Sequence, residues 1–215
     1  PRIYSSEAQR WLGWIASEHD NLRAALAWSL APGGEIQVAV TIVHLINWFW
    51  YRRGHLTEGR EWCRRILEKL NRSHPSRELI LMLMAASLLA TWQGDLDYGV
   101  QNIKDAILYS EVLEDEQTLP LSLLGQGVLL LNRGQAAEAR IYLERGLEIF
   151  REMPFPFFIS NSLIHLGNAA LALGDIPGAR GYLEQAMPLA QAVGEDWLVA
   201  SVLNNLGEVA RVEGD

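Results

Sequence analysis

The chain has 215 residues, of which 49% are hydrophobic and 20% charged, and its formal net charge is -8. This apolar share is too high for a disordered segment, and the acidic balance excludes the broad basic surface that nucleic-acid binding requires. The single cysteine, Cys63, allows neither an internal disulfide nor a paired-cysteine metal site, and no apolar run approaches the roughly 20 residues that span a bilayer. We therefore expect a cytoplasmic protein that contacts neither nucleic acid nor membrane directly.

The first element in chain order is a helical segment over residues 6–30. Its pattern predicts two helices broken near His19 and Asp20. We expect residues 1–34 to form an N-terminal helical pair that packs on the region that follows.

A repeat of 40 residues organises the rest of the chain. Five glycines stand 40 residues apart, and a polar residue follows each of them: Gly54, Gly94, Gly134, Gly174 and Gly214. A glycine in the left-handed conformation ends a helix, and an Asp or Gln after it can cap the next one. Each repeat therefore reads as helix, tight turn, helix.

Two further sets of positions keep the same spacing. Small residues stand five positions after the turn glycine, as Ala139 and Ala179 do, and large apolar residues stand nine after it, as Leu143 and Leu183 do. Small side chains let two antiparallel helices approach closely, and the larger residue fills the space beside the crossing.

The predicted helices follow from these positions. The first helices of the repeats cover 35–53, 76–93, 117–133, 156–173 and 196–213; the second helices cover 56–71, 96–113, 136–152 and 176–192. The repeats are then 35–74, 75–114, 115–154, 155–194 and an incomplete 195–215. The expected fold is an all-α solenoid of about 11 helices.

The residue types and spacing of one repeat resemble the tetratricopeptide repeat. Its residues are Leu163, Leu166, Gly167, Gly174, Asp175, Ala179, Leu183 and Ala186. The period of 40 exceeds the common 34 and is similar to the long-repeat form found in bacterial signalling proteins. The resemblance implies a right-handed superhelix whose first helices line a concave wall.

A second resemblance concerns the N-terminal segments 18–28 and 50–60. They are similar to the region that follows the ATPase core in large bacterial transcriptional regulators of the LuxR-type, SARP-type and maltose-activator classes. No phosphate-binding GxxxxGK[ST] motif occurs in this chain. The resemblance implies a sensor or interaction region whose partners include a neighbouring ATPase domain of the same polypeptide.

Catalytic and metal-binding patterns are missing from the sequence. The five histidines show no metal-ligand spacing, and Cys63 stands at a large apolar position of the repeat, where a packing thiol is expected. We predict neither enzymatic activity nor a cofactor or metal.

The candidate site is the inner wall implied by the tetratricopeptide resemblance. Aromatic, aliphatic and basic residues occupy its first half, and amides and a carboxylate occupy its second. The chosen residues are His44, Trp48, Tyr51, Arg52, Met84, Leu88, Trp92, Asn132, Asn161, Asn168, Asn204 and Glu208. Amides can bond the main chain of an extended peptide, whereas the aromatic residues suit an apolar or sugar-like effector.

Three alternatives remain open from the sequence. The aromatic residues either bind a ligand or pack against their own neighbours, and the region either senses a small effector or serves as a general protein scaffold. Between Arg52 and Glu78, eight basic residues face four acidic ones, which indicates a docking surface or a solvated helix face. Self-association through the incomplete last repeat is also expected.

Overall fold

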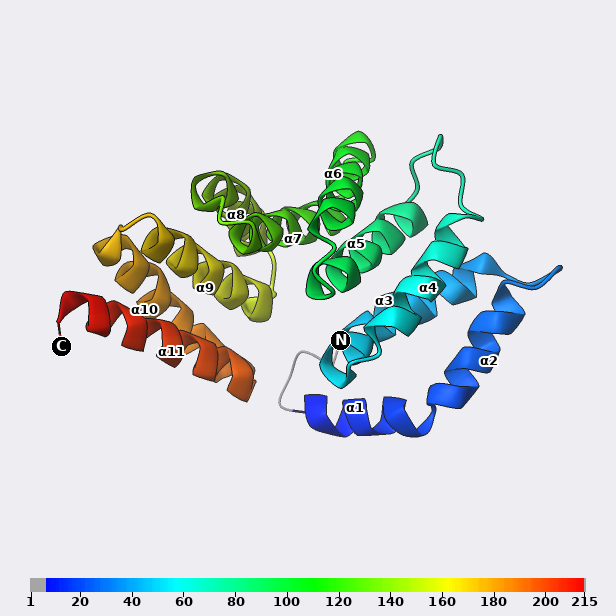
Figure 1. Cartoon of the computed structure of the whole chain (residues 1–215), viewed down its shortest axis with the longest axis horizontal. Coiled ribbons are helices and arrows are strands. Elements are labelled where there is room, and N and C mark those ends of the chain that lie inside the picture. The colour runs from blue at the N-terminus through cyan, green and yellow to red at the C-terminus, as the bar shows by residue number, and fades with distance from the viewer. Residues whose placement is uncertain (1–6, 215) are drawn as a thin grey trace. The chain divides into compact units, whose positions relative to one another are not determined.

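The computed structural model describes residues 7–214, and that range is entirely helical between its turns (Figure 1). Residues 1–6 of the predicted N-terminal pair and Asp215 of the last repeat lie outside the described residues. The helices are α1 (Ala8–Ser17), α2 (His19–Ser29), α3 (Ile36–Arg53), α4 (Leu56–Leu67), α5 (Arg77–Trp92), α6 (Leu96–Val112), α7 (Thr118–Asn132), α8 (Ala136–Arg151), α9 (Pro156–Ala172), α10 (Ile176–Val193) and α11 (Asp196–Glu213). The predicted all-α class and its 11 helices are confirmed for this range.

Helix boundaries agree with the 40-residue spacing, with one clear exception. The helix predicted over 56–71 ends at Leu67. Beyond it the Asn71 side chain accepts a hydrogen bond from the Ser73 amide at 2.9 Å, which favours a turn over a further helical turn. The break predicted near His19 falls at Glu18, which precedes α2.

All five turn glycines have a positive φ, between 73° and 92°, as the spacing predicts. Capping is less regular. Asp95 and Asp175 accept hydrogen bonds from the amides of Tyr98 and Gly178, but Gln135 makes no cap. Its longer side chain instead donates to Glu138 Oε2 at 3.3 Å, so the prediction is right for aspartate and wrong for glutamine.

The small positions bring the helices close together. A Cβ added to Gly167 would lie 2.8 Å from Leu183 Cγ, and one added to Gly127 would lie 2.4 Å from Leu143 Cγ. Ala179, the small residue five positions after the turn glycine Gly174, is fully buried on α10. In these two repeats the leucine predicted to fill the space beside the crossing therefore rests directly on a glycine.

Two compact bodies make up the described chain, one from Gln9 to Gly125 and one from Gln126 onward. In the N-terminal body α3 packs against α2, α4 and α5, and α5 also packs against α4 and α6. In the C-terminal body α9 packs against α8, α10 and α11, and α10 also packs against α11. No helix within residues 7–214 is long and apolar enough to cross a membrane.

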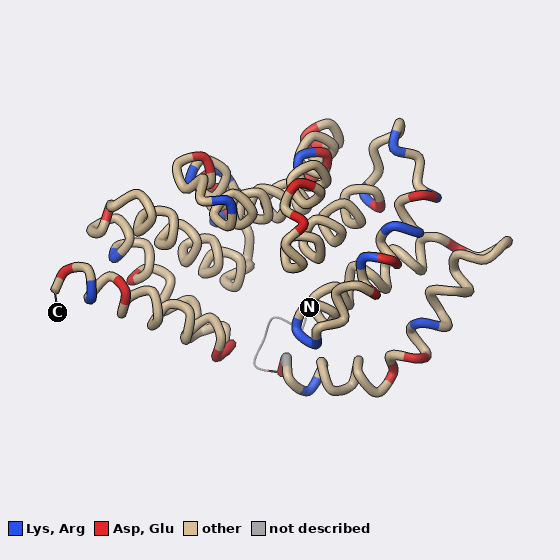
Figure 2. Tube along the Cα trace, in the orientation of Figure 1, with Lys and Arg blue, Asp and Glu red and all other residues tan. Residues whose placement is uncertain are grey.

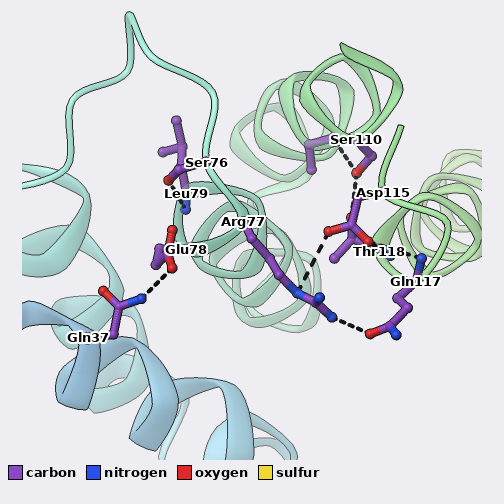
Figure 3. Close-up of polar contacts among 10 residues, drawn as sticks. Gln37, Ser76, Arg77, Glu78, Leu79, Ser110, Asp115, Gln117 and Thr118 are labelled. Atoms are coloured by element: carbon purple, nitrogen blue, oxygen red, sulfur yellow. Dashed lines mark hydrogen bonds and ion pairs between the residues drawn. The ribbon is translucent and has the colours of Figure 1, made fainter. Parts of the chain in front are cut away.

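Polar contacts join successive repeats in the N-terminal body (Figure 3). Gln37 on α3 donates to Glu78 on α5. Arg77 lies 3.7 Å from the Asp115 carboxylate and donates to Gln117 near the start of α7. Residues 37, 77 and 117 are one repeat apart, so the spacing that sets the helices also aligns their side chains.

Candidate functional site

A polar pocket of about 200 Å³ lies in the C-terminal body between α9 and α11. Amide, imidazole, hydroxyl, aliphatic and indole side chains line it. They are Asn161, Ile164, His165 and Asn168 from α9, and Trp197, Ser201, Asn204 and Asn205 from α11. Two packed helices therefore supply every lining residue.

Helical spacing explains how these side chains converge. Asn161, His165 and Asn168 stand four and three residues apart on α9, so they share one helix face. Trp197, Ser201 and Asn205 stand four residues apart on α11. The opposite face of α9 carries Leu163, Leu166 and Ala170, all buried, so the polar face is left to line the pocket.

The amides of this pocket are available for a ligand. Within residues 7–214, the side chains of Asn161, Asn168, Asn204 and Asn205 show no hydrogen bond to other protein groups. Each primary amide offers two donors and one acceptor oxygen. The pocket can thus bind a group that both donates and accepts hydrogen bonds, such as a peptide main chain.

His165 adds an uncharged ring to this surface. Burial lowers its pKa from 6.5 to about 4, because an apolar environment disfavours the imidazolium. At neutral pH the ring therefore offers one donor and one acceptor nitrogen, and it gives the pocket no positive charge.

Only part of the amide half of the predicted site lines the pocket. Asn161, Asn168 and Asn204 line it. Glu208 is exposed and is paired with Arg211, whose Nε lies 2.9 Å from its carboxylate. Asn132 is exposed at the end of α7 and does not line the pocket. Sequence reasoning missed His165, Trp197 and Asn205.

The aromatic half forms a cluster in the N-terminal body. Tyr51 stands between two tryptophans, with ring centroids 4.8 Å from Trp48 and 4.4 Å from Trp92. Trp48 and Tyr51 are half-buried, whereas Trp92 is 45% exposed. The rings of this cluster are therefore partly buried and partly exposed to solvent.

The remaining predicted residues extend this cluster along two helices. His44, Trp48 and Arg52 follow one another at four-residue spacing on α3, as do Met84, Leu88 and Trp92 on α5. His44 is exposed, and Arg52, Met84 and Leu88 are half-buried. Because α3 packs on α5, the Tyr51 to Trp92 contact joins the two stripes.

The basic stretch between Arg52 and Glu78 is largely paired. Arg64 contacts Glu61 and Glu68, and Arg60 donates to Asp95 at 2.6 Å. Figure 2 shows acidic and basic positions close together on α4. A cavity of about 370 Å³ includes Arg60, Glu61 and Arg64, but carboxylates already balance its guanidinium groups. These contacts favour a solvated helix face.

Cys63 is buried on α4 and is not a nucleophile. Its exposure is 0%, and burial raises the pKa of its thiol to about 12. The thiol is therefore protonated at neutral pH and serves packing.

Comparison with known proteins supports a repeat fold. The family model for the tetratricopeptide repeat matches residues 160–196. Rv0890c of Mycobacterium tuberculosis, a proposed HTH-type transcriptional regulator, is 27% identical over 198 residues, which cover 88% of this chain. A counterpart in Mycobacterium bovis matches equally. The chain spans 22% of the length of these relatives.

Solved structures show the same fold at low sequence identity. BtubC from P. vanneervenii has a TM-score of 0.68 and 18% identity, covering 87% of this chain and 77% of its own. Kinesin light chain TPR-like repeats from Podosopora anserina have a TM-score of 0.56 and 16% identity, covering 83% and 95%. Aspartyl phosphate phosphatase F from Bacillus subtilis has a TM-score of 0.62 and 16% identity, covering 78% and 44%. Residues 160–196 thus match the tetratricopeptide-repeat model, and the chain shares the helical-hairpin fold of these solved structures.

Proposed function

We propose that this chain is a non-enzymatic binding region of a larger bacterial ATP-dependent transcriptional regulator, and that the pocket between α9 and α11 binds an extended segment of a peptide or partner protein. The observation that carries the proposal is the convergence of four asparagine amides on one pocket, none of which has a hydrogen-bond partner among residues 7–214. The likeness to HTH-type regulators, of which the chain spans about a fifth, supports the larger context.

The chemistry of the pocket favours a main chain over a charged ligand. Asn161, Asn168 and Asn204 can each donate to a carbonyl and accept from an amide, whatever side chain the peptide carries. No lysine or arginine lines the pocket. The pKa of His165, which burial lowers to about 4, keeps its ring neutral above pH 5. The pocket therefore lacks the cation that would select a phosphate or carboxylate.

A bound segment would also link two helices. α9 and α11 come from successive repeats, so a ligand that bonds both fixes their separation. In the proposed regulator this would alter how the array docks on the neighbouring ATPase domain, which is a population shift that needs different affinities in the two states.

The aromatic cluster supports a second candidate ligand class. Trp48, Tyr51 and the exposed Trp92 present a row of mutually tilted rings that suits a sugar-like or apolar small effector. A general scaffold without small-ligand sensing is the alternative function, and under it only protein segments bind.

The test is a thermal-shift screen of the chain against octapeptide pools, saccharides and nucleotides, followed by calorimetry on the hits. We expect a peptide hit whose affinity falls at least tenfold in the N161A/N168A variant. The matched control is N71A, which removes an amide from the loop between α4 and α5. Equal losses in both variants, or no peptide hit, would contradict the peptide proposal, whereas a saccharide hit lost in W92A would favour the effector.

A further inference from the structure

Two histidines and a glutamate meet in the N-terminal body. His19 is the first residue of α2, His55 precedes α4, and Glu58 lies in the first turn of α4. One ligand atom from each lies within 4.8 Å of the other two. His19 is 8% exposed, and the other two are half-buried.

His19 Nε2 is the atom that the other polar groups of the cluster face. The buried Trp50 lies with its indole N–H toward this nitrogen at 3.3 Å, and Glu58 Oε1 lies 3.3 Å from the same nitrogen. A neutral imidazole nitrogen carries either a proton or one lone pair, so a proton or a metal ion can bridge His19 Nε2 and Glu58 Oε1.

The Glu58 carboxylate keeps acceptor capacity beyond its ion pair with Arg23. An ionised carboxylate offers about four lone-pair positions, and Arg23 donates to both oxygens at 2.7 Å. Oε1 also lies 3.3 Å from His19 Nε2, so this oxygen is placed to share a cation with that nitrogen.

We propose that His19, His55 and Glu58 bind one divalent transition-metal ion, with Zn²⁺ as the best match. Two imidazoles and one carboxylate are a common ligand set for zinc, with a water molecule in the fourth position. Metal–ligand bonds of about 2.0–2.2 Å in a tetrahedron place ligand atoms about 3.3 Å apart, which the His19 to Glu58 distance satisfies.

The other parts of the cluster adjust to complete the site. His55 must move closer to the ion, and this movement falls to its side chain, because its backbone N–H donates to the Trp50 carbonyl at 2.9 Å and its carbonyl accepts from the Gly59 N–H at 3.0 Å. Phe49, which is 1% exposed, stacks on the His55 ring and contacts the edge of His19. Arg23 orients the carboxylate as an outer-shell partner, but its charge opposes the ion, so micromolar affinity is expected.

Such an ion would join α2 to α4. His19 belongs to the helical pair that precedes the first repeat, whereas His55 and Glu58 belong to the first repeat itself. Binding would therefore stabilise the packing of α2 on this repeat, independently of any ligand in the pocket of the C-terminal body.

The test is calorimetric titration of the untagged, EDTA-treated chain with ZnCl₂, together with Co²⁺ absorption spectroscopy. We expect one ion per chain, a rise in melting temperature on adding Zn²⁺, and intense visible Co²⁺ bands typical of a four-coordinate site. H55A and E58Q should each weaken Zn²⁺ binding at least tenfold. H74A removes an exposed histidine outside the cluster and should bind as the wild type does.

A second readout does not depend on variants that alter the fold. The ion takes the lone pair that Trp50 contacts, so the indole N–H resonance of Trp50, assigned with W50F, should shift on adding Zn²⁺. The proposal is overturned if the wild-type chain binds no stoichiometric Zn²⁺, or if H55A binds it equally. It is also overturned if the Trp50 resonance responds to pH but not to Zn²⁺, since a proton then bridges His19 and Glu58.

Discussion

Acid should destabilise the C-terminal body through a single ring, that of His165. In the unfolded chain an imidazole binds its proton with a pKa near 6.5, whereas burial lowers the pKa of His165 in the folded chain to about 4. Between these values the unfolded state carries more protons. The stabilising contribution is therefore fully present above pH 6.5 and is lost as the pH falls toward 4.

The size of the effect follows from the same two pKa values. A shift of this size corresponds to a loss of about 3 kcal/mol over the whole window, of which about 2 kcal/mol falls between pH 7 and pH 5. His165→Gln keeps a polar side chain but removes the titrating ring. Wild type should therefore lose about 2 kcal/mol more unfolding free energy than the variant does on going from pH 7 to pH 5.

Guanidinium-chloride unfolding followed by circular dichroism measures this difference. Carboxylates, together with His19, whose pKa burial also lowers, titrate in both chains, so their contributions cancel. Proton NMR of the His165 ring gives its pKa directly. The reasoning is refuted if that ring titrates near pH 6.5, or if both chains lose stability equally.

Three further predictions concern the packing and capping of the repeats, and chemical denaturation tests each of them. Gly167→Ala should lower the unfolding free energy by about 1–3 kcal/mol because its Cβ meets Leu183. Gly207→Ala, at the equivalent position with nothing within 4 Å, should raise the unfolding free energy by about 0.5–1 kcal/mol. Equal effects of the two substitutions would rule out the close approach at Gly167. Asp175→Ala should cost about 1 kcal/mol through the lost cap, and Gln135→Ala, which removes no cap, should cost clearly less; the opposite order would contradict the capping geometry. Trp92→Ala should lower stability by less than about 2 kcal/mol because Trp92 is 45% exposed, and a larger loss would mark the aromatic cluster as core.

The helices were predictable because their ends depend on local chemistry. A glycine such as Gly174 ends one helix by adopting a positive φ, and Asp175 begins the next by capping it. The end of α4 was not predictable in this way. The side chain of Asn71 competes for the backbone there, and apolar periodicity does not report that competition.

The candidate site was predictable only along one helix at a time. The positions of Asn161, Asn168 and Asn204 in the repeat indicated that they share a wall, and they line one pocket. Trp197 and Asn205 lie outside those positions, and His165 flanks them. Whether these three residues line the pocket depends on how α9 crosses α11, which the sequence alone does not specify. Glu208 shares the repeat position of Asn168, but Arg211 one turn away pairs with it.

Self-association through the last repeat stays a prediction. Leu203 and Val212 on α11 are 57% and 48% exposed. They are nine residues apart, which places them on opposite sides of the helix, so they do not form one apolar patch. By contrast Leu163, one repeat before Leu203, is 2% exposed because α10 covers it.

The alignment of residues 37, 77 and 117 bears on how such chains can change length. Insertion or deletion of a single residue within α3 would rotate one part of that helix by about 100° against the other part and break the contact between Gln37 and Glu78. Loss or gain of a whole 40-residue segment would present the same positions to one another. Recombination in steps of one repeat is therefore tolerated where point insertions are not, and families built this way are expected to differ in the number of repeats more readily than in their period.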